Sequence, residues 1–151
     1  REQQVSKHPE IEEVFFMLTK ITHLHESGED YLEAILVLSK TKGEVRRVDL
    51  ADYFGYSKSS ITVAINSLNV EGLVKTDAKG LLHLTEIGME KAIKIYEQHC
   101  FFKQVLIDAG VDPATADKEA CKLEHCLSQE SFDKLCRAYG RVQDVVNSDR
   151  C

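Results

Sequence analysis

The sequence predicts a mainly α-helical protein with a small β-hairpin, organised as a winged helix-turn-helix followed by a second, α-helical domain. Apolar residues recur at helical spacing through most of the 151 residues. Two predicted helices meet at Gly55, a residue suited to a tight turn, and two short apolar strands follow around residues 77–80. Helix pairs joined by a glycine are common, so the prediction of a winged helix-turn-helix depends mainly on the hairpin that follows the two helices.

Two amphipathic helices are expected before the helix-turn-helix. Residues 11–24 place their apolar side chains on one side of a helix, which we interpret as part of an N-terminal extension, residues 1–25. A second helix with an apolar face is expected over residues 29–39, and Gly43 ends that segment. The sequence gives no indication of what the extension does.

The helix-turn-helix has recognisable capping residues. Asp49 is placed to cap its first helix and Ser57 to cap the second, because short polar side chains accept hydrogen bonds from the first free N–H groups of a helix. The residues expected to face inward are Leu50, Ala51, Phe54, Ile61, Ile65 and Leu68.

Three helices are expected after the hairpin. Thr85 caps a long helix to about Ile107, and Asp112 with Pro113 opens a helix that we expect to run through Cys126. The predicted segments are the extension, residues 1–25; a winged helix-turn-helix, residues 26–84; a helical domain, residues 85–140, whose last helix runs from Ser128 to Gly140; and a tail, residues 141–151.

Charge is unevenly distributed along the chain. The net charge is −6, yet residues 40–84 carry seven Lys/Arg and five Asp/Glu, a balance of +2 that leaves −8 for the rest. The middle of the chain is therefore suited to facing phosphate, and the remainder to gathering cations.

The cellular compartment is predicted from what the sequence lacks. It has no apolar run long enough to span a bilayer, and its first ten residues lack the apolar core of a secretory signal. We expect a cytoplasmic protein with no membrane partner. Its five cysteines are an odd number in a chain without secretory features, so a disulfide framework is not expected.

The stretch CKLEHCLS is the strongest candidate for a metal site. Its Cys121, Glu124 and His125 share one helix face, and a thiolate, a carboxylate and an imidazole together suit Fe(II), Co(II) or Zn(II). A buried cysteine beside a solvated Glu-His pair explains the same pattern equally well. Further ligands are available in Asp30, Glu33 and His99, although acids at a helix start and a single histidine beside aromatic residues are common without a metal.

A family resemblance connects these features. The segments GEDYLEAILVLSK, EQHCFFKQVLIDAGVD and ACKLEHCLS, in this order around the winged helix-turn-helix, resemble the diphtheria-toxin-repressor family of metal-dependent transcriptional regulators, including its manganese-responsive branch. The resemblance covers about residues 27–140 and is to a short form without the SH3-like third domain of longer members. The combination of EDYLEAI with C-x-x-E-H is far more specific than a helix-turn-helix.

The resemblance implies a hybrid metal site. Carboxylates at Asp30 and Glu33 are typical of the manganese branch, whereas the thiol of Cys121 is typical of iron-responsive members. Lys103 stands where many relatives have a glutamate, so a second metal site is expected to be incomplete or absent. Fe(II) is the favoured ion and Mn(II) is possible, with Co(II), Ni(II) or Zn(II) as surrogates. The implied ligands are Asp30, Glu33, His99, Cys121, Glu124 and His125.

The resemblance also implies a repressor, not an enzyme, that controls iron or manganese homeostasis. The metal would join the DNA-binding and helical lobes, since without it their acids would repel one another, and a homodimer would then match a palindromic operator. Candidate base-reading residues are Ser57, Lys58, Ser59, Ser60 and Thr62, and candidate backbone contacts are Lys75, Lys79, Arg46 and Arg47, each otherwise an ordinary surface residue.

Two other functions fit parts of the pattern. A winged-helix regulator could sense oxidants through Cys121 or Cys126 without a metal. A metal-dependent hydrolase could use the Cys-Glu-His cluster with a bound water, but the chain has no H-E-x-x-H pattern, and ligands from several helices leave little open coordination.

Overall fold

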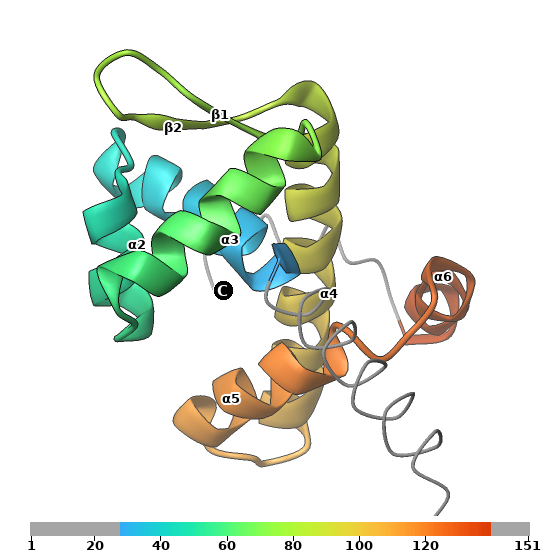
Figure 1. Ribbon diagram of the computed structural model, residues 1–151. Coiled ribbons are helices and arrows are strands. Elements are labelled where there is room, and N and C mark those ends of the chain that lie inside the picture. Colours follow the sequence, from blue (N-terminus) through green and yellow to red (C-terminus); the bar gives the residue numbers. More distant parts are fainter. Residues whose placement is uncertain (1–27, 140–151) are drawn as a thin grey trace, which may run out of the picture.

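The computed structural model describes residues 28–139, and the predicted extension helix, Gly140 and the tail lie outside the described residues. A winged helix-turn-helix forms one end of the described part, and helices α4 to α6 form the other (Figure 1). The fold class predicted from the sequence is confirmed. In the described part of the chain, no helix is both long and apolar enough to cross a membrane.

The first described helix covers residues 28–42, which is longer at its C-terminal end than predicted. Leu32 and Ile35 on its inner face are each 1% exposed and belong to the core of the DNA-binding lobe. The ring of Tyr31 meets that of Phe54 edge to face at 5.0 Å between centroids. The helix is therefore fixed to the helix-turn-helix on one side, which leaves its other side to face the helical lobe.

The helix-turn-helix consists of α2 (Arg47–Phe54) and α3 (Lys58–Val70). Gly55 ends α2 with a φ of 69°, a left-handed conformation that glycine adopts without strain, and Ser57 caps α3 as predicted. Asp49 was predicted to be the N-cap of α2, but that position is held by Arg46. Asp49 lies in the first turn of α2, where its carboxylate accepts a hydrogen bond from the N–H of Arg46 at 2.7 Å.

The wing is an antiparallel hairpin of β1 (Val74–Thr76) and β2 (Leu82–Leu84). The Asp77 carboxylate stabilises its turn by accepting hydrogen bonds from the backbone N–H groups of Lys79 and Leu81. Arg46 pairs with Leu81 as an isolated bridge, so the segment before α2 lies along the wing. The wing and the helix-turn-helix thus form one packed unit.

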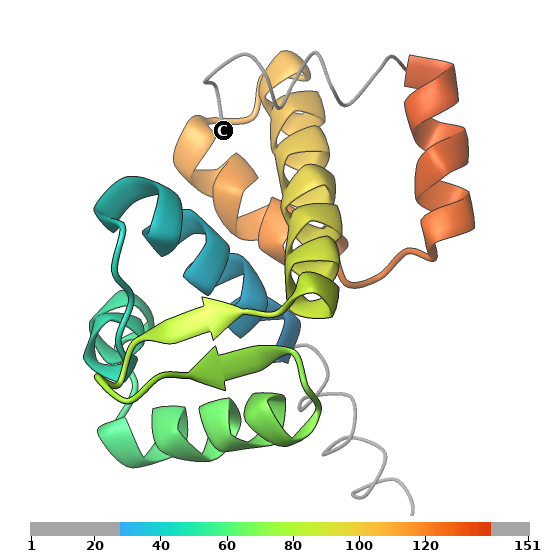
Figure 2. The same ribbon diagram turned by 90° about the horizontal axis from the view of Figure 1, so that it is seen from above.

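The helical lobe begins with α4 (Glu86–Asp108), which leaves directly from β2 (Figure 2). Thr85 caps α4, as predicted. Gly88 allows α4 to pass close to the backbone just before β1, because a Cβ atom there would lie only 1.9 Å from the carbonyl oxygen of Leu73. This close approach fixes the direction in which α4 leaves the DNA-binding lobe.

Helices α5 (Pro113–Leu123) and α6 (Gln129–Tyr139) lie on different sides of α4 (Figures 1 and 2). Asp112 caps α5 as predicted, but the helix ends at Leu123 and does not run through Cys126. The N–H of Cys126 bonds to the carbonyl of Leu123, three residues back, so the chain turns here. This turn, residues 124–126, holds two of the predicted metal ligands.

Candidate metal centre

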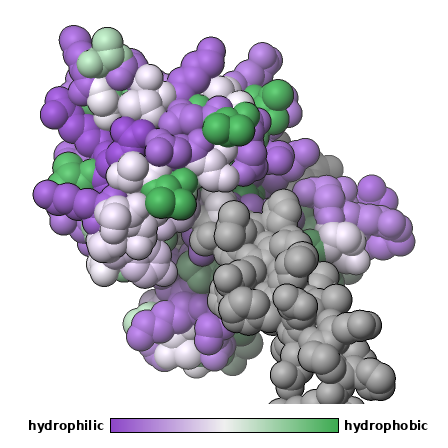
Figure 3. Space-filling model, in the orientation of Figure 1, coloured by the Kyte–Doolittle hydropathy of each residue, from purple (hydrophilic) through white to green (hydrophobic). Residues whose placement is uncertain are grey.

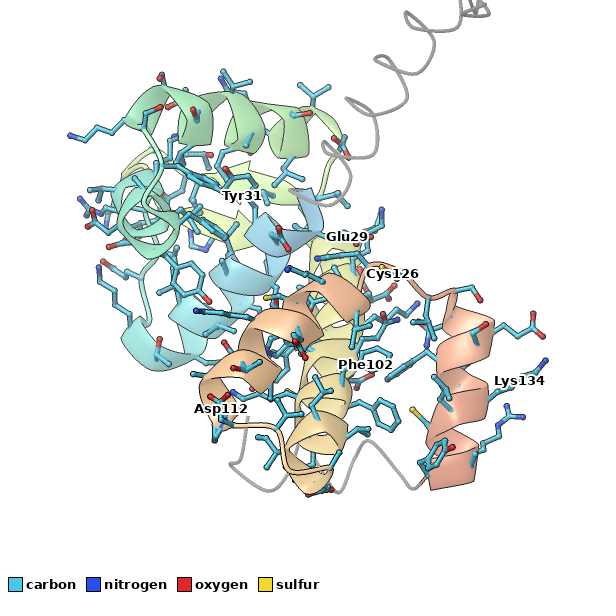
Figure 4. The ribbon with its side chains drawn as sticks, turned by 90° about the horizontal axis from the view of Figure 1, so that it is seen from below. Glu29, Tyr31, Phe102, Asp112, Cys126 and Lys134 are labelled. Carbon is cyan, nitrogen blue, oxygen red and sulfur yellow. The ribbon has the colours of Figure 1, made fainter. Side chains whose placement is uncertain are left out.

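All six predicted ligands converge where the helix over residues 28–42 meets the end of α5. Their potential donor atoms fall into two groups, in each of which all atoms lie within 4.8 Å of one another. Figure 4 shows Glu29 of that helix close to the turn that contains Cys126. Sequence spacing did not establish this convergence. The first group is Glu33, His99, Cys121 and Glu124, and the second is Asp30, Glu124 and His125.

Glu124 is the residue common to both groups. It caps the C-terminus of α5, and its side chain is 0% exposed. Its Oε2 lies 2.7 Å from Nδ1 of His99, and its Oε1 lies 3.2 Å from Nε2 of His125. That Nε2 bonds to Asp30 instead, so Oε1 is buried without a hydrogen-bond partner. An oxygen in this state is suited to a cation, because burial without a partner is otherwise costly.

His99 lies in the middle of α4 and is 7% exposed. Its two ring nitrogens face different partners: Nδ1 faces Glu124 at 2.7 Å and Glu33 at 4.0 Å, whereas Nε2 lies 3.1 Å from Oδ1 of Asp117. Asp117 was not predicted from the sequence, although it precedes Cys121 by four residues and so shares its face of α5.

His125 connects the helical lobe to the DNA-binding lobe. Its Nδ1 lies 2.6 Å from Oε2 of Glu29, and its Nε2 lies 2.7 Å from Oδ1 of Asp30. The first contact joins residues 96 positions apart in the sequence, and the second joins residues 95 positions apart. Glu29 was also missed. The available signal was its position beside Asp30 in the first turn of the helix.

The carboxylates keep both imidazoles protonated in the metal-free protein. Burial alone lowers the pKa of His99, but hydrogen bonds with Cys121 and Glu124 outweigh it and raise this pKa to about 11. For His125, burial is likewise outweighed by hydrogen bonds with Asp30 and Glu29 and by the nearby carboxylate of Glu124, which together raise its pKa to about 12. Metal ligation requires a lone pair, so an ion must displace these protons.

The two carboxylates between the histidines differ in their protonation. Burial and the charge of Glu124 raise the pKa of Glu33 to about 7, against the opposing effect of His99. Burial alone would also raise the pKa of Glu124, but contacts with His125 and His99 keep it below its usual value. The sequence led us to expect that these acids repel one another without a metal. The charge of Glu124 does raise the pKa of Glu33, and the nearby His99 opposes part of that effect.

The donor atoms of the two groups suit different ions. The first offers a thiol, an imidazole and two carboxylates, which favour borderline transition ions, whereas the second offers only oxygen and imidazole nitrogen, which harder ions also accept. A pocket of about 630 Å³ opens onto Asp30, Glu33, Cys121 and His125, so an ion can enter from solvent. The described residues therefore fit a divalent transition metal.

The cysteines divide into two kinds. Cys121, Cys126 and Cys136 are free thiols, and the first two are exposed. Cys100 is buried and disulfide-bonded, which the sequence did not predict. Lys103 belongs to neither group of potential ligands; its Nζ lies 2.8 Å from Oδ1 of Asp117.

The candidate DNA-binding residues lie around the start of α3 and along the wing. Lys58, Ser59 and Thr62 are exposed, whereas Ser57 uses its hydroxyl for the cap. Figure 3 shows a mainly hydrophilic surface with scattered apolar side chains. The remaining candidates that are exposed are Ser60, Lys75, Lys79 and Arg46.

Arg47 differs from the other candidates in being half-buried. Its guanidinium donates hydrogen bonds to Asn66 at 3.3 Å and to Thr76 at 3.5 Å, and its Nε has no partner. It therefore lies between α3 and β1, where it connects α3 to the wing.

Comparison with known proteins places these features in a family. Residues 23–82 match the N-terminal DNA-binding domain of iron-dependent repressors, and residues 85–145 match their metal-binding and dimerisation domain. The chain is 34% identical over 110 residues to the transcriptional regulator MntR of Listeria monocytogenes, covering 72% of this chain and 77% of the relative. It is 36% identical over 125 residues to an HTH-type transcriptional regulator of Methanocaldococcus jannaschii, covering 82% of this chain and 100% of the relative.

Solved structures agree with these matches. The manganese regulator SloR superposes with a TM-score of 0.65 at 26% identity, over 73% of this chain and 52% of that chain. A manganese-dependent transcriptional repressor in complex with manganese gives a TM-score of 0.67 at 26% identity, over 74% of this chain and 51% of that chain. This chain thus spans about half the length of each of these two.

Proposed function

Because the chain belongs to the iron-dependent repressor family of metal-dependent transcriptional regulators, we propose that occupation of its six-residue metal site controls its binding to a palindromic operator. The observation that supports this most directly is the contact of His125 with Glu29 and Asp30, because it joins the DNA-binding lobe to the metal-binding lobe. The family consists of regulators and not enzymes, so the hydrolase alternative is set aside.

The two groups of potential ligands would hold two divalent ions that share Glu124. Each oxygen of that carboxylate faces one group of potential ligands, Oε2 toward His99 and Oε1 toward His125. When bound, a cation in each group would supply the positive charge that the imidazolium protons supply in the metal-free protein. Asp30 and Glu33, as ligands from the helix over residues 28–42, would hold that helix against the end of α5.

Ion choice follows from the donor set. The thiol of Cys121 favours Fe(II) over Mn(II) in the first group, whereas Mn(II) suits the oxygen-rich second group. Co(II), Ni(II) and Zn(II) are expected to bind as surrogates, because each generally binds nitrogen and sulfur ligands more tightly than Mn(II) or Fe(II) does. The cellular supply of iron and manganese then decides which ion acts.

DNA contact is assigned to the start of α3 and to the wing. Lys58, Ser59, Ser60 and Thr62 are placed to reach base edges, and Lys75, Lys79 and Arg46 to reach phosphates. Ser57 and Arg47 support these surfaces, the first as a cap and the second as a connection between α3 and β1. Two copies joined through the dimerisation domain match a palindrome, since a twofold dimer presents two equal recognition helices.

DNA binding by the reduced full chain tests this proposal. Duplexes are first selected from a random-sequence pool with Mn(II) or, under anaerobic conditions, Fe(II), and their affinity is then measured by fluorescence anisotropy. We expect palindromic duplexes that bind with the metal and are released by chelator. Lys58→Ala should weaken binding and lower its salt dependence while leaving metal binding intact. Equal DNA affinity with metal and with chelator would contradict the proposal.

The oxidant-sensing alternative retains one supporting observation, which is that the thiols of Cys121 and Cys126 are both free and exposed. It predicts that peroxide changes DNA affinity while chelators do not. The same anisotropy experiment, repeated with peroxide in place of chelator, distinguishes the two functions.

A further inference from the structure

Asp117 forms a contact that neither group of metal ligands explains. It lies on α5 with its side chain 50% exposed, and its Oδ1 lies 3.1 Å from Nε2 of His99 and 2.8 Å from Nζ of Lys103. The aspartate is thus placed between the outer edge of the metal site and a lysine one turn further along α4.

The contact determines which nitrogen of His99 is available to a metal. A neutral imidazole carries one N–H and one lone pair, and the hydrogen bond at one nitrogen leaves the other as the ligand atom. With Nε2–H donating to Asp117, the lone pair of Nδ1 faces Glu124 and Glu33, which belong to the first group. With the opposite tautomer, the lone pair would face Asp117 and the site would lose a ligand.

The second group has an equivalent arrangement with the ring atoms exchanged. Nδ1 of His125 lies against Glu29, outside the group, and Nε2 faces Asp30 and Glu124, inside it. Each histidine is therefore oriented by one carboxylate that is not itself among the grouped ligands.

We propose that Asp117 is a positioning residue for metal binding: it fixes His99 in the tautomer whose Nδ1 binds the ion, and Lys103 holds its carboxylate in place. This inference rests on the proposed function, since it concerns the same metal site. Lys103 thereby has a defined role beside the site without being a ligand.

A surface ion pair between Asp117 and Lys103 is the competing explanation. Such pairs contribute little when solvent-exposed, and this one would be indifferent to metal. The two explanations differ in what removal of the carboxylate does to metal affinity, and in the nitrogen through which His99 binds.

Metal affinity of matched variants is the test. Co(II) is titrated anaerobically into the reduced full chain and into Asp117→Ala, Asp117→Asn and Glu119→Ala. Glu119 is an exposed acid on the same helix with no contact to the site, so it controls for loss of charge. We expect Asp117→Ala to weaken Co(II) binding about tenfold or more, as for other outer partners of metal-bound histidines. Asp117→Asn should weaken it less, because its amide oxygen still accepts a hydrogen bond, and Glu119→Ala should change it less than about twofold.

Long-range ¹H–¹⁵N correlation spectra of the Zn(II)-loaded wild-type chain provide a second readout that does not depend on how the variants fold. Zinc bound through Nδ1 of His99, with the proton on Nε2, is the expected result. Zinc bound through Nε2, or equal Co(II) affinities for Asp117→Ala and Glu119→Ala, would overturn the inference and leave the metal site itself in place. Failure of the wild type to bind Co(II) would overturn the proposed function and this inference together.

Discussion

The two ligand groups share Glu124 but are assembled differently. The group around His99 takes three of its four members from the helical lobe, includes the only thiol, and is braced by Asp117 from that same lobe. The group around His125 contains only oxygen and nitrogen donors and is braced by Glu29 from the DNA-binding lobe. From this difference we propose a division of roles, in which the first group selects the ion and the second contributes more to joining the lobes.

Loss of the shared carboxylate should have the largest effect. Glu124→Gln removes a charged ligand from both groups at once, so we expect Co(II) affinity to fall by at least about a hundredfold. Isothermal titration against Glu119→Gln, an equal charge change on the exposed face of α5, provides the comparison. A variant that still binds two ions normally would show that Glu124 does not bridge the groups.

Loss of the thiol should affect one group only. Cys121→Ser is expected to weaken Co(II) and Zn(II) binding by about tenfold or more, and Mn(II) binding much less, because manganese prefers oxygen ligands. Cys126→Ser is the matched control, being an exposed free thiol outside both groups. Equal losses for Mn(II) and Zn(II) would contradict a role for Cys121 in ion selection.

Metal affinity should increase with pH. The pKa values of about 11 for His99 and about 12 for His125 lie above neutral pH, so each histidine must lose a proton before it can bind an ion. Binding in the second group therefore releases about one proton from His125, and that affinity rises about tenfold per pH unit between about pH 7 and 9. Binding in the first group releases a proton from His99 and one from the ligating thiol of Cys121, so its affinity rises more steeply. Below pH 7, Glu33, with a pKa of about 7, adds to the release. Calorimetry in buffers of different ionisation enthalpy counts these protons; none released would refute the protonated state of the histidines.

The smallest expected effect concerns the junction between lobes. Glu29→Gln keeps a hydrogen-bond acceptor near His125 but removes the charge, so metal affinity should fall only a few-fold. Metal-dependent DNA affinity should fall further, by about tenfold, because Glu29 also connects the lobes. Glu90→Gln, an exposed acid on α4, is the control. Equal losses of metal and DNA affinity would show that Glu29 acts on the metal alone.

The sequence predicted the features that depend on local chemistry. Ser57, Thr85 and Asp112 cap their helices as expected, because capping requires only a short polar side chain before a helix. The end of α5 was placed too late, at Cys126, since no proline or glycine marks the turn after Leu123.

Long-range features of the site were beyond sequence reasoning. Spacing indicated Cys121, Glu124 and His125 as candidate ligands, and the family resemblance implied the other three. Neither gave their division into two groups, which depends on which oxygen of Glu124 faces which histidine. Glu29 and Asp117 were missed because each acts on a histidine of another element. The protonated state of both histidines follows from their contacts with neighbouring side chains, which outweigh the opposing effect of burial, and these contacts form only when the lobes pack together.

Anaerobic Co(II) titration of the reduced full chain, compared with Cys121→Ser, tests the metal site most directly. The predicted result is two ions per chain and a thiolate-to-cobalt charge-transfer band, with the band absent from Cys121→Ser while one ion still binds. The absence of a charge-transfer band from the wild type, or a band that persists in Cys121→Ser, would contradict a site in which the thiol of one group and the shared carboxylate of both hold divalent metal.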